Sequence, residues 1–428
     1  MKVKTAALLW DESFLWGLMA YKALKANGLP FKLIRSEDIK SGELKNYSLL
    51  FVPGGWASNK LKALGDKGIA EIKRFVNNGG NYLGFCGGAG LATTDGIGLL
   101  PIKRIPTKDR VPSFSGRIHL NVKRHPMWKI AECEMRNADL NPKSEIVFHA
   151  WWPSQFSIGD RGIKILASYG EAMPDAFSSD LNVGDVETGC GWKELEKIYG
   201  INLDPRRLTN EPAVVEGSYG KGKVILSLIH FDTPDDKNGA EVLRNLWKYL
   251  VENADAPSYP PLKLRGGRGS YEIGNRKSEI VELMSDLKSA VDDLISLGIR
   301  SFLWFRRNPM LLQWRRGVRG LEYCTLYVMI KELSAISCQP SAIRDKGKLD
   351  EIKTLLLPFI KKAKKLLIME RLAMQNSHIT YERCDDPEIR KLREKLFGNS
   401  KSHGGLFKEL INKVDDLLYL LLSDHERR

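Results

Sequence analysis

The sequence predicts an α/β domain with a mostly parallel sheet and helices on both faces, followed by an all-α helical bundle domain. Through the first 250 or so residues, strand-type apolar runs alternate with amphipathic helical patterns, which is typical of parallel sheets. A stretch rich in proline and glycine then interrupts the chain, and only helical spacing follows it. We therefore expect an α/β domain over residues 1–255, a linker over 256–275 and a helical bundle over 276–428.

The alternation of strands and helices is most regular before residue 90. Asn27-Gly28 and Gly79-Gly80 supply the glycines that typically end helices. The middle of the chain is less regular, and Gly217–Gly220 is a hairpin signal between two apolar runs. We expect helices over 14–26, 61–78 and 240–253, and strands over 3–10, 31–35, 48–53, 81–85, 117–122, 145–148, 164–168, 213–216 and 223–229.

Beyond the linker, apolar residues recur every three or four positions, which predicts helices with one buried face. Such stripes need partner helices to cover them, so we expect a bundle with a core of its own. The predicted helices span 278–297, 321–337, 348–375, 386–397 and 406–422.

The composition argues against several classes of protein. No apolar run approaches the roughly 18 residues that cross a bilayer. The six cysteines include no CxxC pair, which argues against a disulfide framework and a zinc site. We predict a reducing, cytoplasmic setting, with no metal and no cofactor. The net charge is +14, of which +10 falls in residues 261–428, and it fits either an anionic partner or a solvated helical surface.

The most distinctive segment is the end of the strand at 81–85, where Cys86 is followed at once by Gly87-Gly88-Ala89-Gly90. A nucleophile on such a turn has a strained backbone, and small neighbours let the strand and the next helix pack closely. A helix N-terminus favours the thiolate, and the Gly87 N–H can hold an oxyanion. The alternative is a small core cysteine beside an ordinary tight turn. Cys190, which lacks a preceding apolar strand, is a weaker rival thiol.

A second glycine loop, Gly54-Gly55, ends a neighbouring strand. Ligands of open α/β sheets bind at the carboxyl ends of strands, so we expect this loop to complete the oxyanion hole beside Cys86. Other residues after strands are candidates for the rim or wall of the same pocket, although helix capping or core packing explains them equally well. These pocket candidates are Asp11, Glu12, Trp56, His149 and Trp151.

The strand predicted over 223–229 runs into His230-Phe231-Asp232. Side chains at i and i+2 share one face of a strand, so His230 and Asp232 are expected to lie together. A histidine can take the thiol proton, and a carboxylate can fix the imidazole tautomer. Cys86, His230 and Asp232 form the predicted catalytic set. An ordinary pair at the end of a strand is the alternative.

Three segments carry a resemblance to a known family: Leu50–Gly55, Tyr82–Ala89 and Tyr219–Ser227. With them, residues 1–253 resemble class I glutamine-amidotransferase-like domains. More narrowly, they are similar to the domain that precedes the catalytic core of fungal biotin–protein ligases. The resemblance implies a flavodoxin-like fold. No segment resembles the biotinyl-adenylate loop of the ligase core, so biotin ligation is not implied.

The resemblance also assigns roles to residues. The nucleophile falls on Cys86, the histidine on His230 and the acidic partner on Asp232, although the family pattern is usually His-x-Glu. It implies a cysteine-dependent hydrolase or acyl transferase acting on an amide-type bond. Glutamine, another small amide and a peptide all stay open as substrates. A binding or regulatory module that retains the elbow fold without turnover is the alternative.

The helical part resembles no family that we can name, and we expect it to serve association with a protein partner or with itself. Two segments that mix aromatic and basic residues, 302–307 and 311–316, are candidates for the contact surface. A buried aromatic core with a solvated arginine rim explains them equally well. We expect no nucleic-acid partner, because no recognised binding fold accompanies the charge.

Overall fold

The computed structural model describes residues 5–130, 145–159, 162–187, 191–251, 274–337, 346–376, 380, 384–399 and 403–427. The chain divides into two compact units, Met1–Ser258 and Tyr259–Arg428. All but the last two positions of the predicted linker, and Cys190, lie outside the described residues.

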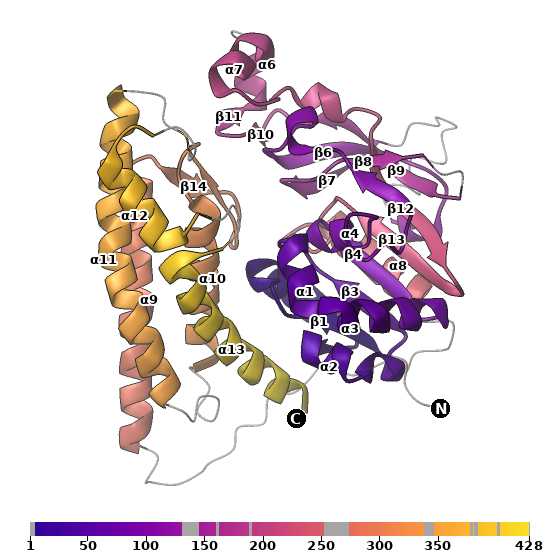
Figure 1. Cartoon of the computed structure of the whole chain (residues 1–428), viewed down its shortest axis with the longest axis horizontal. Helices are drawn as coiled ribbons and strands as arrows, with labels where there is room; N and C mark the ends of the chain where they lie inside the picture. The colour runs from indigo at the N-terminus through magenta and orange to yellow at the C-terminus, as the bar shows by residue number, and fades with distance from the viewer. Residues whose placement is uncertain are drawn as a thin grey trace. The chain divides into compact units, whose positions relative to one another are not determined.

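The first unit is built on one large sheet with the strand order β11-β10-β6-β9-β12-β13-β4-β3-β1-β2, and β7 pairs with β6 off this path (Figure 1). The strands β13, β4, β3, β1 and β2 are parallel neighbours. The α/β class is therefore confirmed, and its parallel part holds Cys86. The strands are β1 (Ala6–Leu9), β2 (Phe31–Ile34), β3 (Leu49–Val52), β4 (Asn81–Phe85), β6 (Phe114–Val122), β7 (Glu145–Trp151), β9 (Lys164–Ala172), β10 (Phe177–Ser178), β11 (Leu181–Asn182), β12 (Pro212–Tyr219) and β13 (Gly222–Ser227).

The rest of the sheet is antiparallel, because the β12–β13 hairpin reverses the chain direction. Gly220 makes this turn with a φ of 59°, as the hairpin signal predicted. From β12 outward, each pairing described is antiparallel. A separate two-stranded ribbon joins β5 (Ile102–Arg104) to β8 (Phe156–Ile158).

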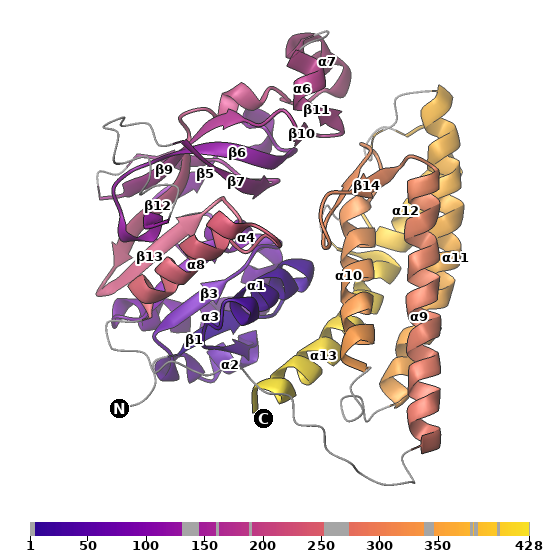
Figure 2. The same cartoon turned by 180° about the vertical axis from the view of Figure 1, so that it is seen from behind.

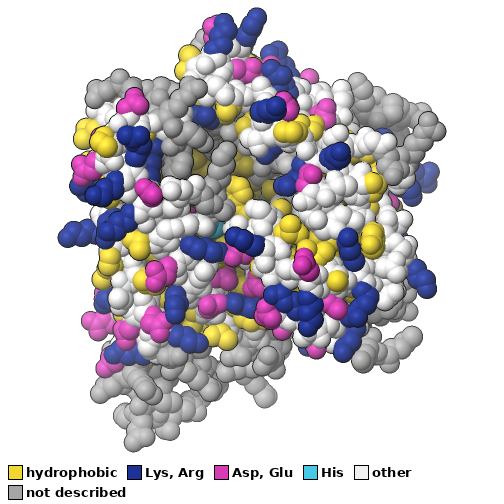
Figure 3. Space-filling view, viewed as in Figure 1, with side chains coloured by type: hydrophobic (Ala, Val, Ile, Leu, Met, Phe, Trp, Pro, Cys, Tyr) yellow, Lys and Arg dark blue, Asp and Glu magenta, His cyan; other side chains and the backbone are white. Residues whose placement is uncertain are grey.

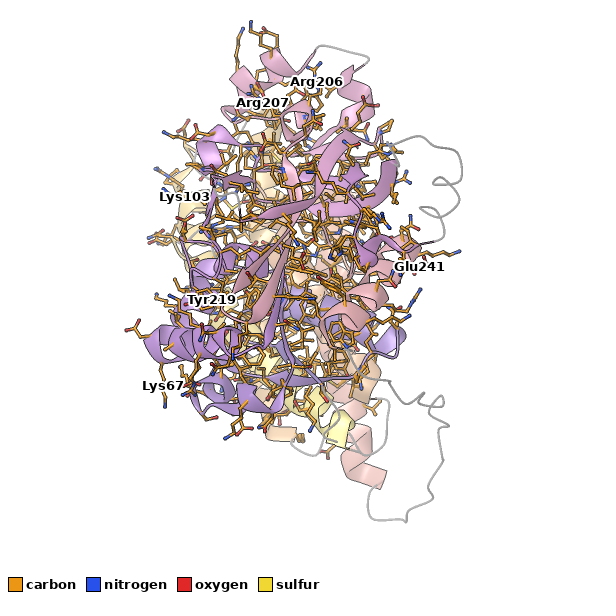
Figure 4. All side chains as sticks on the ribbon, turned by 90° about the vertical axis from the view of Figure 1, so that its right-hand side faces the viewer. Lys67, Lys103, Arg206, Arg207, Tyr219 and Glu241 are labelled. Atoms are coloured by element: carbon orange, nitrogen blue, oxygen red, sulfur yellow. The ribbon has the colours of Figure 1, made fainter. Side chains whose placement is uncertain are left out.

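Helices cover both faces of the parallel strands. Helix α8 shares a face with α1, since Arg244 Nη1 donates to Asn27 Oδ1 at 2.5 Å at the end of α1. Helix α3 lies on the other face, and Lys67 of α3 and Glu241 of α8 point away on opposite sides (Figures 2 and 4). The α-helices are α1 (Phe14–Ala26), α2 (Ser36–Lys40), α3 (Ala57–Asn77), α4 (Gly87–Leu91), α6 (Val183–Glu187), α7 (Trp192–Tyr199) and α8 (Lys237–Leu250), and the short 3₁₀ turns are η1 (Glu43–Asn46), η2 (Thr107–Asp109), η3 (Pro126–Trp128) and η4 (Pro205–Leu208).

Element boundaries follow the apolar pattern closely near the N-terminus. Helix α1 and strand β4 match their predicted spans residue for residue. Helix α3 begins earlier than predicted, at Ala57, and Gly65 interrupts it with φ 57° and ψ −177°. Strands β7 and β9 run longer than predicted, because their pairing with β6 continues as far as Trp151 and Ala172.

Among its described residues, the second unit contains five helices and one short hairpin. Each helix overlaps one of the five that the apolar spacing predicted, whereas the hairpin was not predicted. The rings of Tyr323, Phe359, Phe397 and Phe407 meet in the core, with centroids 5.6–6.4 Å apart. The elements are α9 (Gly274–Arg300), β14 (Trp304–Arg306), β15 (Leu312–Trp314), α10 (Gly320–Ser337), α11 (Lys346–Asn376), α12 (Pro387–Phe397) and α13 (Gly405–Arg427).

The hairpin contains the two aromatic–basic segments and divides them between core and surface. Trp304 is buried and donates its Nε1–H to the Ile295 carbonyl at 3.0 Å. Phe302 is 72% exposed and Phe305 is 45% exposed. Basic side chains lie among acidic ones over the face in Figure 3. The association role of this surface stays a prediction.

Candidate active site

Cys86 lies on a strained turn between β4 and α4. Its φ of 47° and ψ of −105° fall in a sparsely allowed region, as predicted for an elbow nucleophile. The turn is held on both sides, because the Cys86 N–H donates to the Ser227 carbonyl at 2.8 Å and the Gly90 N–H donates to the Cys86 carbonyl at 2.9 Å. Helix α4 has only five residues, so individual N–H groups, more than a long helix dipole, set the potential at the thiol.

The Gly54-Gly55 loop packs directly against this turn, as the argument from strand ends predicted. A Cβ on Gly87 would lie 1.7 Å from the Gly55 carbonyl oxygen, so only glycine fits there. Gly55 itself has a φ of 108°. Within the described part of the chain, the N–H groups of Gly55 and Gly87 donate no hydrogen bond to another protein group. Two backbone donors next to Cys86 are therefore available to an oxyanion.

His230 and Asp232 form a completely buried pair in which Nδ1 lies 3.0 Å from Oδ1. The strand argument for this pair was wrong, because β13 ends at Ser227 and the pair lies in the turn that follows. Backbone contacts fix this turn: the His230 N–H donates to the His149 carbonyl at 2.9 Å, and the Thr233 hydroxyl donates to the His230 carbonyl at 2.9 Å. The Asp232 carboxylate, one methylene shorter than that of a glutamate, thus reaches the imidazole.

The second ring nitrogen of His230, Nε2, is buried and has no hydrogen-bond partner among the described residues that meets geometric criteria. Burial disfavours the charged ring, but the charge and hydrogen bond of Asp232, helped by the Cys86 thiol, outweigh burial and raise the pKa of His230 to about 9. Since Asp232 occupies Nδ1, Nε2 is the ring atom left to interact with Cys86.

Tryptophan residues lie beside both His230 and Cys86. The Trp16 ring lies 4.7 Å from the His230 ring, and Trp152 lies 6.2 Å from Trp16. The Cys86 thiol makes a long contact of 3.9 Å with the Trp151 carbonyl oxygen. The Trp151 ring is buried and donates its Nε1–H to the Thr233 hydroxyl at 3.0 Å. The backbone of Trp151 therefore faces the thiol while its ring braces the His230 turn.

The other pocket candidates lie at different distances from the chemistry. His149 Nδ1 lies 2.8 Å from Asp236 Oδ2, and the His149 ring stacks on Trp151. His149 therefore supports the position of the Trp151 ring. Asp11 accepts the Ser36 N–H at 2.6 Å, where α2 begins. Glu12 lies closer, because a Cβ on Gly55 would come within 2.6 Å of its carbonyl oxygen. Trp56 is 37% exposed at the start of α3.

Three residues near the site were missed by the sequence interpretation: Trp16, Arg110 and Tyr169. Trp16 carries no signal beyond its place on an apolar helix. Arg110 Nη1 donates to the Pro153 carbonyl at 2.8 Å. The Tyr169 hydroxyl is buried without a hydrogen-bond partner among the described residues. No local spacing relates Arg110 or Tyr169 to Cys86, because the antiparallel extension of the sheet brings them there.

Comparison with protein families agrees with the predicted resemblance. Residues 39–95 match the family described as the N-terminal domain of biotin–protein ligase. The resemblance is confirmed for this segment. It contains the Gly54-Gly55 loop and the Cys86 turn, and ends before the His230 pair. No curated protein matches the chain.

Several solved structures are similar to part of the chain. A glutamine amidotransferase shares 18% identity, with 58% of this chain and 98% of that chain covered and a TM-score of 0.34. A ThuA-like protein from Bacteroides uniformis shares 14% identity, with 59% and 94% covered and a TM-score of 0.37. A β-galactosidase from Rahnella sp. R3 shares 14% identity, with 57% and 31% covered and a TM-score of 0.34.

Neither a metal site nor a membrane span is found in the parts of the chain that the structure describes. There, no group of three or more His, Cys, Asp or Glu side chains is placed to hold a metal ion. None of the helices described is both long enough and apolar enough to cross a membrane.

Proposed function

We propose that the chain is a cysteine-dependent hydrolase or acyl transferase that acts on an amide-type bond. Cys86 is the nucleophile, His230 the acid and base, and Asp232 the residue that orients His230. One observation carries this proposal: a buried imidazole is held by a carboxylate at Nδ1, and its remaining nitrogen is left to a thiol on a strained elbow. Such chemistry needs a reduced thiol, which fits the cytoplasm.

The raised pKa of His230 suggests how the first step proceeds. At neutral pH the protonated ring stabilises a Cys86 thiolate, and the thiolate attacks the amide carbonyl carbon. The N–H groups of Gly55 and Gly87 receive the oxyanion. The C–N bond then breaks, the Nε2 proton passes to the leaving amine, and an acyl group stays on sulfur as a thioester.

The second step releases the acyl group. The ring of His230 is now neutral and takes a proton from a water molecule, whose oxygen adds to the thioester carbon. The C–S bond breaks, and the thiolate and the protonated ring form again. In a transferase, an amine or alcohol replaces water. Asp232 keeps the Nδ1 proton in place throughout both steps.

An activated ester tests the proposal without knowledge of the substrate. The full chain is mixed with p-nitrophenyl acetate, and p-nitrophenol release and the intact mass are followed together. We expect a burst of one equivalent, one acetyl group on Cys86, and slow turnover. Cys86→Ala should remove the burst and the adduct.

The matched control variant is Cys324→Ala. Burial raises the pKa of Cys324 to about 12, so this thiol should contribute nothing to the burst. If the wild-type protein forms no acetyl-Cys86, the proposal that it is an enzyme of this kind is rejected. It would favour the alternative, a binding module that retains the elbow.

A further inference from the structure

The Arg110 guanidinium and the Cys86 thiol contact the same short turn. Arg110 Nη1 donates to the Pro153 carbonyl, and the Cys86 thiol contacts the Trp151 carbonyl, two residues earlier. Consecutive Cα atoms are about 3.8 Å apart, so less than about 8 Å of backbone separates these two anchor points. Trp152 between them has a φ of 49°, which gives the turn a sharply bent shape.

Arg110 brings a positive charge that no carboxylate among the described residues neutralises. Its neighbour Arg104 is different, because Arg104 Nε lies 3.8 Å from an Asp95 carboxylate oxygen. Burial lowers the pKa of Arg110, the Cys86 thiol opposes this decrease, and Arg104 adds to it. An arginine still stays charged at neutral pH. Arg110 is therefore a cation beside the nucleophile, and the anion that acts on it most strongly is the Cys86 thiolate and not a carboxylate.

Tyr169 adds a hydroxyl to the same neighbourhood. It lies on β9 and is fully buried, and its hydroxyl has no hydrogen-bond partner in the described part of the chain. Burial, and then the charge of Cys86, raise the pKa of Tyr169 well above its ordinary value, while Arg110 acts in the opposite direction. Tyr169 thus stays a neutral donor, on a strand that the sheet order β9-β12-β13-β4 places three positions from the strand that leads into Cys86. A buried donor without an acceptor is costly, and an acceptor on a ligand would relieve that cost.

We propose that Arg110 and Tyr169 bind a carboxylate of the substrate, so that Cys86 acts on amides that carry a negative charge. This inference rests on the proposed function and adds a substrate class to it. The planar guanidinium suits a carboxylate, with which it can form two parallel hydrogen bonds. A carboxylate adds one negative charge to a site that already holds the Cys86 thiolate, whereas a phosphate dianion would add two.

Two alkylating reagents that differ only in this group test the inference. Iodoacetate carries a carboxylate and iodoacetamide a neutral amide, and both lose iodide when the Cys86 thiolate attacks. The rate of each at Cys86 is measured on the full chain by peptide mass spectrometry, with free cysteine as the reference. We expect the ratio of the iodoacetate rate to the iodoacetamide rate to exceed that of free cysteine at least tenfold.

Variants of Arg110 and Tyr169 distinguish recognition of the carboxylate from structural support of the Trp151–Pro153 turn. Arg110→Gln should lower the ratio at least tenfold, and Tyr169→Phe should lower it about threefold. Arg110→Lys keeps the charge but loses the planar pair of donors, so it should retain only part of the ratio. Arg117→Gln is the matched control, because Arg117 pairs with Asp175 on the surface. If Arg110→Gln slows both reagents equally, Arg110 only holds the Trp151–Pro153 turn and the inference is overturned. A wild-type ratio equal to that of free cysteine would also overturn it.

Competition tests the choice of a carboxylate. Sodium acetate should slow the iodoacetamide reaction at Cys86, and inorganic phosphate should not. Stronger protection by phosphate would overturn the carboxylate assignment. Alkylation needs no acyl turnover, so the two proposals fail separately. If the expected ratio is found but no acetyl-Cys86 forms, the carboxylate site is supported and the proposed enzymatic activity is rejected.

Discussion

The two units each bury a charge pair, and the pairs differ in what they leave free. In the first unit, His230 and Asp232 share one hydrogen bond, and the ring keeps Nε2 without a geometric partner among the described residues. In the second unit, the guanidinium of Arg393 donates to Glu370 Oε1 at 2.8 Å, to the Thr380 carbonyl at 2.8 Å and to the Gly317 carbonyl at 2.7 Å. Arg393 therefore connects three separate segments, whereas His230 keeps one atom for another task.

Burial of a charge pair is thus a poor guide to function, because both pairs are equally hidden. The better guide is the chemistry next to the unsatisfied atom. Nε2 of His230 is left to a thiol on a strained turn. Glu370 Oε2 also lacks a hydrogen-bond partner among the described residues, but the group that acts on this carboxylate most strongly is Arg393, which is not a nucleophile. We therefore interpret the first pair as catalytic and the second as structural.

Removal of one partner should be most harmful in the structural pair. Arg393→Met leaves the Glu370 carboxylate buried and unpaired, and should lower the free energy of unfolding of the second unit by about 3–5 kcal/mol. Urea unfolding followed by hydrogen exchange in α11 and α12 would measure this. The double variant Arg393→Met with Glu370→Met should recover most of the loss. An equal loss in single and double variants would show that the pair itself is not what stabilises the unit.

In the His230–Asp232 pair, the corresponding change should affect rate more than stability. His230→Gln keeps a donor for Asp232 but removes the proton carrier, so the acetylation burst at Cys86 should slow by about 100-fold. Stopped-flow measurement of p-nitrophenol release gives the rate, and thermal unfolding checks the fold. His119→Gln, on β6 outside the candidate site, is the matched control. A burst that is as fast as wild type would remove His230 from the proposed mechanism.

Local patterns predicted much of the fold and the centre of this site. Features that depend on neighbours in sequence could be predicted. They are the spans of α1 and β4, the Cys86 turn, and the contact between His230 and Asp232. Even so, the reason offered for the last pair was wrong, since the strand ends before it.

The remainder of the site depends on contacts between distant segments. Tyr169 lies near Cys86 only because β9 joins the sheet through β12, and an apolar strand pattern does not show what a buried hydroxyl faces. Arg110 is one of 66 basic residues, and its role emerges only where its carbonyl partner is seen. The hairpin at β14 and β15 was missed because its strands have three residues each.

The pH dependence of the two pairs gives a sharper comparison. Asp232 raises the pKa of His230 to about 9, above its ordinary value of 6.5. The stability and acid function of the charged ring are therefore fully present below pH 6.5 and are lost as the pH rises through about 9. Asp232→Asn removes the opposing charge, so burial then dominates. The alkaline limb of the burst rate should move down by more than about one pH unit. If the alkaline limb of the burst rate, measured from pH 6 to 10, does not move in Asp232→Asn, the limb reports the titration of a group other than His230.

The smallest effect is expected for Glu370. Burial raises the pKa of this carboxyl to about 7, even though Arg393 acts against the shift. Because the folded pKa lies above the ordinary 4.5, the contribution of this group to stability is present below pH 4.5 and is lost as the pH rises through about 7. The slope of the unfolding free energy from this group cannot exceed about 1.4 kcal/mol per pH unit.

Glu370→Gln should remove that slope, since an amide has no proton to lose in this range. Native-state hydrogen exchange over α11 at pH 5, 6, 7 and 8, corrected for intrinsic exchange rates, would measure it. Glu388→Gln is the matched control, because Glu388 pairs with Lys365 at the surface and should carry little of the slope. If the wild-type slope survives in Glu370→Gln, then Glu370 does not titrate between pH 5 and 8, and the slope belongs to another group. The buried pair of the second unit would then keep one charge state over this range, whereas the His230–Asp232 pair would still change its charge as the pH rises through about 9.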